Sequence, residues 1–424
     1  MIKFCEVCKS SNIDKVLDLG DHALCDDLIE IGDNRKSKQY PIKVFFCNDC
    51  KTAHQSCQPS KNELFPEKYH YRSRFTLDVL DGMKELVESV EKFRGSLIDL
   101  KVLDVGCNDG SLLKIFKAKG CKTFGIEPTA AVDDISGEDH NIIKDFFSED
   151  SSEKILSEFG KFDLITFTNV FAHISDLDSL LRALNNLMHE NTILIIENHY
   201  LGSILKKNQF DTFYHEHPRT YSLQSFIEIS SRLKRELSHV SFPKRYGGNI
   251  RVFISSKNSS IETAKLIKEV YQLEGNLKTK FMEMSEFIRN WKTAKRKQIL
   301  KMIQENNGPI IAKAFPGRAA IIINILELDI QHIKCIYEKP GSKKIGHFVP
   351  GTKIPIVSDY ELFSNIKKHK FILNLAWHIP EEINNYLVEK NNHYYKTNSH
   401  LHNYQYINLL QLLYPYHHKQ QTNL

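Results

Sequence analysis

The stretch that most constrains the fold runs from Lys101 to Pro128 and reads KVLDVGCNDGSLLKIFKAKGCKTFGIEP. Apolar residues before Gly106 predict a short strand, the glycines at 106 and 110 predict a tight turn, and the apolar spacing after them predicts a helix. A second apolar run ends in Glu127, about 20 residues after the glycines, where a βαβ unit places the carboxylate that binds a ribose. The sequence therefore predicts an α/β half-fold that binds a nucleoside.

The turn differs from the Gly-x-Gly-x-x-Gly pattern, because three residues separate Gly106 from Gly110. This spacing argues against a dinucleotide bound through its pyrophosphate. It resembles the first motif of class I S-adenosylmethionine methyltransferases, in which the backbone closes around the aminoacyl end of the cofactor. The residues that we expect to contact S-adenosyl-L-methionine are Gly106, Asn108, Gly110 and Glu127. The alternative is a glycine turn in another kind of α/β protein.

Further strands of this domain end in polar or aromatic residues. Apolar runs predict strands at 142–147, 162–168 and 192–197. The carboxyl ends of parallel strands form the edge at which open α/β sheets bind ligands. We therefore expect Phe147 and Asn169 to contact the cofactor. His173 and Glu197 are expected to face the same edge.

Length and composition set the outer limits. A chain of 424 residues is expected to fold into two or three domains, and 41% apolar with 26% charged residues is typical of a soluble globular protein. The net charge of +5 is too small to require a nucleic-acid partner. No apolar run is long enough for a membrane span or a signal peptide. We therefore expect a cytoplasmic monomer with neither a membrane nor a nucleic acid as partner.

Four of the nine cysteines form two C-x2-C pairs, Cys5 with Cys8 and Cys47 with Cys50. In a chain without an export signal, such pairs are typical of a metal site and not of a disulfide framework. Together they supply the four thiolates of a tetrahedral zinc, which leaves no coordination position open for catalysis. We therefore expect one structural Zn²⁺ that holds an N-terminal module together. The alternatives are two unrelated buried pairs or a redox-active C-x2-C.

The densest group of polar side chains lies at 210–217, with the sequence FDTFYHEH. Ionised groups are costly to bury unless they are paired, so this run indicates a functional site. Alternate residues of an extended segment point the same way, so His215 and His217 could bind a metal. Alternatively, His217 is a general base near neutral pH, and Tyr214 and Glu216 position it or the substrate. We favour the base, because methyl transfer from a sulfonium needs no metal.

A base has a clear purpose if the methyl acceptor is a carbon. Unlike nitrogen or thiolate acceptors, a carbon must first lose a proton, and a carbon beside a ketone does so when donors stabilise the enolate oxygen. We expect His217 to remove that proton. Tyr214 and His173 are the expected donors. Tyr71, in an aromatic segment just before the cofactor domain, is a further candidate.

A second α/β sheet is predicted over 308–390, where short apolar runs are separated by turns. Its first strand ends in the turn from Lys313 to Ala319, which contains Arg318. An arginine fork binds a phosphate bidentately. We therefore expect Lys313 and Arg318 to bind the substrate. A long charged segment of helical period, 261–304, links the two sheets.

Nearly the whole chain resembles the sugar C-methyltransferases that act on nucleotide-linked keto-deoxysugars. Proteins of this family have an N-terminal zinc-binding module, a central S-adenosylmethionine domain and a C-terminal Rossmann-like domain. The motifs that carry the resemblance are the two cysteine pairs, GCNDG at 106–110, GIEP at 125–128, NVFAH at 169–173, YHEH at 214–217, GGNIR at 247–251, VPGTKIPI at 349–356 and LAW at 375–377.

The resemblance implies that His217 removes the proton at C3 of the sugar, beside a C4 ketone. The residues that would line the same site are Tyr71, Tyr214, Glu216 and His173. The implied substrate is a sugar linked to a nucleoside diphosphate, and we expect Arg251 of the GGNIR motif to bind it. One departure is the turn from Lys313 to Ala319, where the family has tyrosine-glycine-alanine and lysine-glycine. Because of this departure, the identity of the nucleotide and that of the sugar are not predicted.

The expected fold class is α/β, with a central class I methyltransferase (Rossmann-like) domain between a zinc-binding module and a C-terminal Rossmann-like domain that binds the nucleotide sugar. The predicted domains are 1–62, 63–245 and 246–410. Two other activities stay open. An O-methyltransferase acting on a nucleotide sugar or other small molecule would differ in the methylated atom. An RNA methyltransferase would show steeply salt-dependent RNA binding.

Overall fold

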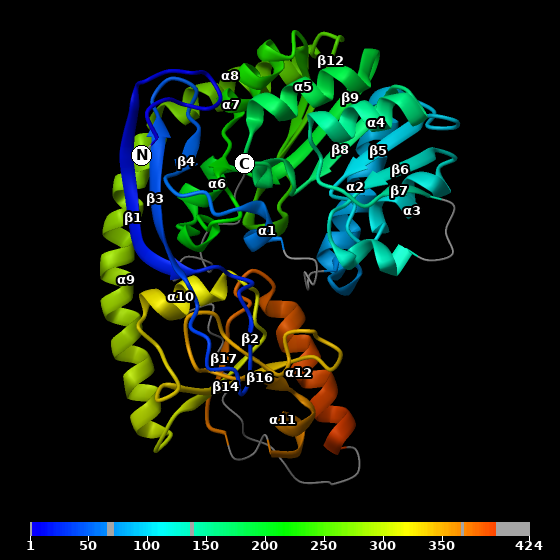
Figure 1. Ribbon diagram of the computed structural model, residues 1–424. Coiled ribbons are helices and arrows are strands. Elements are labelled where there is room, and N and C mark those ends of the chain that lie inside the picture. Colours follow the sequence, from blue (N-terminus) through cyan, green and yellow to red (C-terminus); the bar gives the residue numbers. More distant parts are fainter. Residues whose placement is uncertain (1, 66–71, 136–139, 366–368, 396–424) are drawn as a thin grey trace. The chain divides into compact units, whose positions relative to one another are not determined.

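The computed structural model describes residues 2–65, 72–135, 140–365 and 369–395, and the chain forms two compact units (Figure 1). Unit 1 comprises Met1–Asp18, Lys43–Lys206 and His215–Phe281, and unit 2 comprises Leu19–Ile42, Lys207–Tyr214 and Met282–Leu424. Within the described ranges, no helix is both long and apolar enough to cross a membrane. The three predicted domain boundaries stay a prediction, because each unit gathers several separate stretches of sequence.

A seven-stranded sheet forms the centre of unit 1, in the order β11-β12-β9-β8-β5-β6-β7. Its strands are β5 (Lys101–Val105), β6 (Lys122–Ile126), β7 (Asn141–Ile143), β8 (Phe162–Thr168), β9 (Met188–His199), β11 (Glu236–Ser241) and β12 (Asn249–Ser255). β12 is antiparallel to both of its neighbours, and the other pairs are parallel. The order of the strands reverses next to β5, so the carboxyl ends of β5 and β8 are the expected ligand position. This confirms the predicted α/β class, although β7 is shorter than the predicted strand at 142–147.

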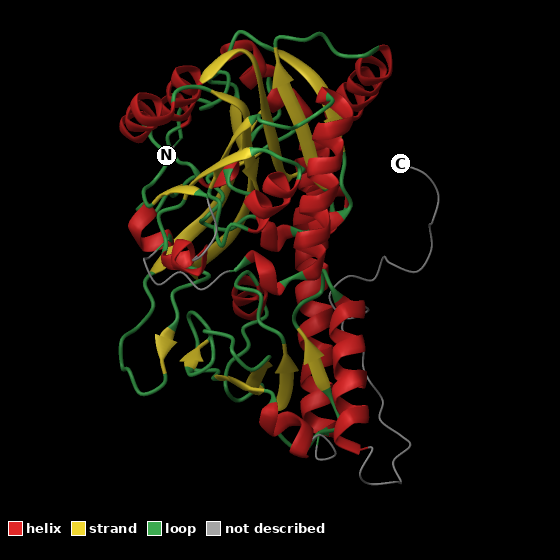
Figure 2. Ribbon diagram, turned by 90° about the vertical axis from the view of Figure 1, so that its right-hand side faces the viewer, coloured by secondary structure: helices red, strands yellow, loops and turns green. Residues whose placement is uncertain are grey.

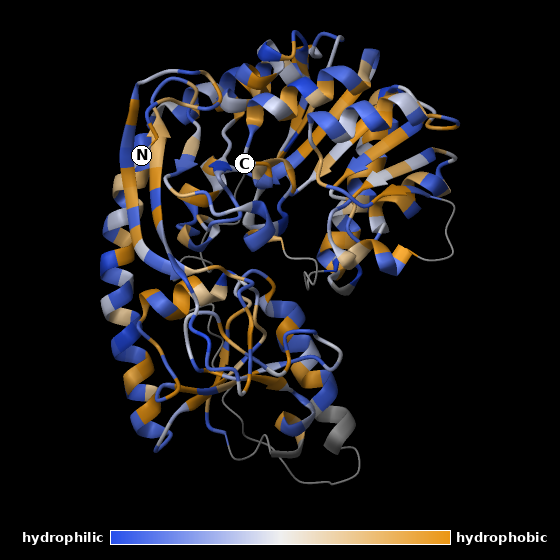
Figure 3. Ribbon diagram, in the orientation of Figure 1, coloured by the Kyte–Doolittle hydropathy of each residue, from blue (hydrophilic) through white to orange (hydrophobic). Residues whose placement is uncertain are grey.

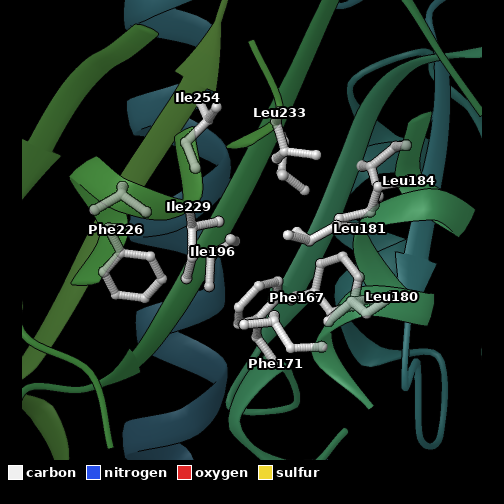
Figure 4. Close-up of a cluster of buried hydrophobic side chains, with 14 of the residues drawn as sticks. Phe167, Phe171, Leu180, Leu181, Leu184, Ile196, Phe226, Ile229, Leu233 and Ile254 are labelled. Atoms are coloured by element: carbon white, nitrogen blue, oxygen red, sulfur yellow. The ribbon is translucent and has the colours of Figure 1, made fainter. Parts of the chain in front are cut away.

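Helices cover both faces of this sheet (Figure 2). One face packs on α2 (Leu77–Arg94) and α3 (Ser111–Ala118). The other packs on α4 (Glu149–Phe159), α5 (Leu177–Leu187), α7 (Leu223–Arg232) and α8 (Ile261–Leu273). Figure 4 shows part of this second cluster, in which leucines of α5 lie beside Phe167 of β8, and Phe226 of α7 lies farther along, beside Ile229. Apolar residues dominate the strands, whereas the covering helices show apolar and polar stripes, as expected for amphipathic helices (Figure 3).

A smaller sheet joins the two cysteine pairs to a distant part of the chain. Its strands, in spatial order, are β1 (Ile13–Ala23), β3 (Gln39–Cys47), β4 (Ala53–Gln55) and β10 (Arg219–Thr220). β10 is antiparallel to β4, with Arg219 opposite His54. Unit 1 also contains two short helices, α1 (Lys61–Leu64) and α6 (Leu201–Lys206).

Unit 2 contains a four-stranded parallel sheet, which confirms the predicted second α/β sheet. Its strands, in spatial order, are β16 (Ile356–Ser358), β14 (Ile333–Glu338), β13 (Ile310–Lys313) and β17 (Ile372–Asn374). The remaining elements are the strand pair β2 (Ile29–Glu30) and β15 (His347–Phe348), and the helices α10 (Ala319–Ile325), α11 (Tyr360–Asn365) and α12 (Pro380–Tyr395). The predicted helical linker is α8 followed by α9 (Leu277–Glu305), with a 3₁₀ turn at Glu274–Asn276 between them.

Candidate functional site

The four paired cysteines converge on one point of unit 1. Their sulfur atoms all lie within 4.8 Å of one another, with 3.4 Å between Cys5 and Cys50 and 3.6 Å between Cys8 and Cys47. A tetrahedral zinc with Zn–S bonds of about 2.3 Å requires S–S distances of about 3.8 Å. The cluster therefore fits one zinc ion. Among the described residues, these four cysteines are the one group of three or more metal-binding side chains that lie this close together. His215 and His217 do not belong to such a group.

The protonation of these thiols also fits a cation. A hydrogen bond between Cys5 and Cys47 raises the pKa of the Cys5 thiol to about 12. The same bond, with another from Cys50, lowers the pKa of Cys47. A divalent metal ion at this point is what would allow several neighbouring sulfurs to ionise side by side.

The glycine turn between β5 and α3 has the conformation that its sequence predicts. Gly106 and Gly110 have φ values of 72° and 74°, and Asn108 has a φ of 49°. A Cβ atom on Gly106 would lie 2.6 Å from Val170 Cγ2, so this position accepts only glycine without movement. Glu127, just after β6, accepts hydrogen bonds from the Asn108 amide at 3.2 Å and from the hydroxyl of Thr129 at 2.6 Å. The structure thus brings together the cofactor-binding residues predicted at this turn.

Phe147 and Asn169 lie in the same unit but differ in their surroundings. Phe147 is buried, and its ring packs edge-on against Phe167 at 5.9 Å between centroids. Asn169 directly follows β8 in a left-handed conformation, with a φ of 55°. Its amide donates to the Glu197 carbonyl at 2.7 Å, and its side-chain oxygen accepts from Asn249 at 3.4 Å. Asn169 is therefore held at the carboxyl end of β8, as predicted.

The imidazole rings of His173 and His199 both pack against that of His217. The rings of His173 and His217 pack edge-on with 4.9 Å between centroids, and His199 lies 5.3 Å from His217. The Glu216 carboxylate lies 3.8 Å from Nδ1 of His173. Burial lowers the pKa of His173 to about 4, so this imidazole is neutral at physiological pH. A neutral imidazole has one N–H to donate and one nitrogen to accept, which suits the predicted donor role.

Two residues next to this cluster were missed by the sequence analysis. His199 is the last residue of β9, and Tyr246 lies 5.5 Å from its ring. Tyr246 has a φ of 53°, an unusual conformation for an aromatic residue, and it precedes two glycines that also have positive φ. The position of His199 just after a predicted strand was a usable signal. Tyr246 carried no comparable one.

Glu197 does not face an open edge, which corrects the expectation from its position in β9. Its side chain is 0% exposed. Its carboxylate binds Nε of Arg245 at 2.6 Å and Nε of Arg251 at 2.7 Å. Arg251 also donates to the hydroxyl of Ser89 in α2 at 2.8 Å. Two guanidinium groups neutralise this buried carboxylate, and the network ties β9, β12 and α2 together.

Asp104 of β5 is a second buried carboxyl that the sequence analysis did not single out. It is 3% exposed and accepts a hydrogen bond of 2.7 Å from the hydroxyl of Thr166 in β8. Burial, with a smaller contribution from the charge of Glu127, raises the pKa of Asp104 to about 7. This group therefore changes its charge near neutral pH.

The predicted substrate-binding residues of the second sheet lie in unit 2. Lys313 ends β13, fully buried, with its ammonium 2.7 Å from Asp359. The side chain of Arg318 is 10% exposed, and its guanidinium lies 4.9 Å from the centre of the Trp377 ring and 3.4 Å from Asp211. Tyr214 also belongs to unit 2, where its amide donates to the carbonyl of Thr212 at 3.1 Å.

Tyr71 lies outside the described residues, so its predicted place at the site stays a prediction.

Three family models match successive parts of the chain. The model for "Putative zinc binding domain" matches residues 5–65, the model for "Methyltransferase domain" matches 54–233, and the model for "C-methyltransferase C-terminal domain" matches 244–401. Their order is the order that the sequence predicts: zinc module, methyltransferase, C-terminal domain.

A curated relative matches along almost the same length. C-methyltransferase NovU of Streptomyces niveus is 24% identical over 392 residues, which are 89% of this chain and 90% of that protein. The similarity therefore covers all three parts of the chain.

Solved structures of methyltransferases match less than half of the chain. Magnesium protoporphyrin IX methyltransferase (ChlM) from Synechocystis PCC 6803 with bound SAH is 15% identical, covering 42% of this chain and 84% of that chain, with a TM-score of 0.33. The plantazolicin methyltransferase BpumL in complex with SAH is 13% identical, covering 43% and 86%, also with a TM-score of 0.33.

The matched domains explain both the cysteine cluster and the glycine turn. Zinc is held by the four N-terminal cysteines, and S-adenosylmethionine is the cofactor of the central sheet. The domain that matches residues 244–401 is found in enzymes that methylate carbon. The three matched domains and the C-methyltransferase relative together support an S-adenosylmethionine-dependent C-methyltransferase with an N-terminal zinc-binding domain.

Proposed function

We propose that this enzyme methylates a carbon atom of a nucleotide-linked keto-deoxysugar, at C3 beside a C4 ketone, with His217 as the general base. One observation carries the proposal. The loop that follows β8 borders the glycine turn through Val170 and packs against His217 through His173. One short segment therefore adjoins both the cofactor turn and the imidazole of the proposed base. A proton-abstracting group and a methyl donor must meet in this way for a carbon acceptor.

The proposed chemistry begins with loss of a proton from carbon. His217 removes the proton at C3, and the electrons of the C–H bond enter an enolate whose negative charge rests on the C4 oxygen. His173 is neutral, so its N–H can donate to that oxygen. When bound, S-adenosylmethionine supplies a methyl group on a positively charged sulfur, which is an electrophile for the enolate carbon. Glu216, near Nδ1 of His173, is proposed to orient that ring.

We assign the diphosphate of the substrate to Arg318. Its guanidinium is held by Trp377 and Asp211, while its buried Nη2 has no hydrogen-bond partner among the described residues. A buried N–H without a partner is costly, and a phosphate oxygen would satisfy it. Arg251 and Lys313 already bind the carboxylates of Glu197 and Asp359. Their contact with the substrate stays a prediction, one that requires those ion pairs to open.

The experiment that tests this function identifies the methylated atom. The enzyme is incubated with S-adenosylmethionine that carries a ¹³C-labelled methyl group and with a panel of nucleotide 4-keto-deoxysugars. We expect one sugar of the panel to give a product whose labelled methyl couples to a ring carbon in the NMR spectrum. A label on oxygen would establish the O-methyltransferase instead. Absence of any product, together with steeply salt-dependent RNA binding, would favour the RNA methyltransferase.

A further inference from the structure

The backbone just after His217 is a strand of the sheet that carries the zinc ligands. Gln55 of β4 donates its amide hydrogen to the carbonyl of Pro218 at 2.8 Å, and Arg219 of β10 lies opposite His54. In the same sheet, β3 ends at Cys47. The zinc module therefore fixes the chain one residue beyond the proposed base.

The side chain of Arg219 connects three parts of unit 1. It is 0% exposed, and its guanidinium binds the carboxylate of Glu6, which lies between two zinc ligands in the sequence. It also donates to the carbonyls of Ile174 and Ser175, with 2.8 Å to the second. These two carbonyls directly follow His173. Its Nε donates to the hydroxyl of Tyr221 at 2.9 Å.

Other contacts attach the zinc loops to the segment that follows. The hydroxyls of Ser222 and Ser225 donate to the Cys50 carbonyl at 3.2 and 3.3 Å. Arg232 of α7 donates to the carbonyls of Glu6 and Val7 at 3.1 and 3.0 Å. These contacts hold the module in place, but none of them reaches the segments next to the histidines. Arg219 differs because it is two residues from His217 and bonded to the residues after His173.

We infer that Arg219 is a positioning residue for the reaction, through which the zinc module sets the placement of His173 and His217 relative to each other. The inference rests on the proposed role of His217. A planar guanidinium donates in several fixed directions at once, so it can bind one carboxylate and two carbonyls in a single geometry. A lysine keeps the charge but offers only a point-like ammonium, and it cannot keep all of these bonds. The zinc module thus contributes to catalysis by geometry, without chemistry at the metal.

The test compares Arg219→Lys and Glu6→Gln with a matched control, Arg232→Lys. The control alters another arginine that binds the zinc loops, and it also binds Asp178 of α5, but the structure shows no hydrogen bond from it to Ile174 or Ser175. Four quantities are measured in the full-length zinc-loaded protein: zinc content, affinity for S-adenosylmethionine, the ring ¹H–¹³C NMR signals of His173 and His217, and steady-state kinetics. The two histidine signals are assigned by their loss in His173→Gln and His217→Gln.

We expect Arg219→Lys to shift both histidine signals and to lower kcat by about 10- to 100-fold, the size of effect that follows a small displacement of catalytic groups. Zinc content, KM and cofactor affinity should stay close to wild type. Glu6→Gln should shift the same signals by less, and because the side chain of Glu6 is partly exposed, it provides the test if Arg219→Lys does not fold. Arg232→Lys should leave both signals in place.

Unshifted histidine signals in Arg219→Lys, or in Glu6→Gln if only that variant folds, would overturn the inference. So would an equal loss of kcat in Arg232→Lys, because that result would indicate a general effect on folding. Failure of the proposed function gives a different pattern. In that case His217→Ala would keep its turnover, whereas the signal shifts in Arg219→Lys would still report the structural link.

Discussion

Burial is the main cause of the shifted pKa values of two residues of this enzyme, His173 and Asp104. His173 stays neutral because its imidazole is withdrawn from water, and Asp104 keeps a proton to near neutral pH for the same reason. Neither shift is visible in the sequence, since each depends on which side chains the folded chain places around the group.

Replacing His217 by alanine should lower kcat by about 10²- to 10⁴-fold, the usual loss when a general base is removed. Affinity for S-adenosylmethionine, measured by calorimetry, should stay within about 2-fold, since the general base acts on the acceptor and not on the cofactor. His189→Ala is a suitable control because His189 lies at the opposite end of β9 from His199. Turnover near wild type in His217→Ala would remove this residue from the mechanism.

Replacing Asp104 by asparagine should stabilise the protein at pH 8. The pKa of this carboxyl is about 7 in the folded protein, whereas its ordinary value is 3.8, so the native state binds the extra proton between these values. The free energy of unfolding of the wild type therefore falls as pH rises from about 4 to about 7, by about 1.4 kcal/mol per pH unit. Asparagine keeps the acceptor for Thr166 but cannot ionise.

Urea unfolding of both proteins at pH 6, 7 and 8 measures this effect. The advantage of Asp104→Asn should be largest at pH 8 and should shrink towards pH 6. Asp81→Asn, at an exposed position of α2, should show no such trend. A constant difference between Asp104→Asn and wild type over this range would mean that Asp104 is not the titrating group.

At the level of elements, the sequence predicts the strand, the turn and the helix at which we expect the cofactor to bind. The strand, turn and helix around Gly106 are confirmed, as is the second sheet over 308–390. Strands with periodic apolar residues and local glycine turns are visible in a single stretch of sequence. β10 could not be predicted in this way, because it has two residues and its partner β4 lies far away in the chain. The misplacement of Glu197 has a similar cause, since its arginine partners follow about 50 residues later.

Gly106→Ala tests the turn, with Gly160→Ala as its matched control. The two glycines have almost the same φ, 72° and 71°, so alanine introduces backbone strain at both. At Gly106 the new Cβ would also meet Val170 at 2.6 Å, whereas at Gly160 the nearest atom, Lys101 Nζ, lies at 3.7 Å. We expect Gly106→Ala to weaken cofactor binding at least about 10-fold, a loss of about 1.4 kcal/mol, and Gly160→Ala to leave it unchanged. Equal affinities in a titration would contradict the place given to this turn.

On the scale of the whole molecule, the parts of the zinc module that carry the four cysteines belong to unit 1. Its sheet includes β10, and its loops accept hydrogen bonds from α7. The sequence predicts the four ligands and the metal, because C-x2-C pairs carry their own spacing. It does not predict that the strand after YHEH completes the module.

Removal of zinc should therefore affect two regions far apart in the sequence. We expect one zinc ion per chain, and its chelation should increase hydrogen exchange in β3 and β4 and also in β10, which pairs with β4. The central strands β5 and β8 should stay protected. Exchange confined to residues before 65, with β10 unchanged, would show that the module is independent of the YHEH segment.

Removal of a proton from carbon by His217 can be measured by solvent exchange, without methyl transfer. The enzyme is saturated with S-adenosylhomocysteine in ²H₂O, and the C3 proton signal of its keto-sugar substrate is followed by NMR. We expect the wild-type enzyme to exchange that proton, and His217→Ala to exchange it about 10²- to 10⁴-fold more slowly. Exchange at an equal rate in both proteins, after subtraction of the uncatalysed rate, would show that His217 is not the base.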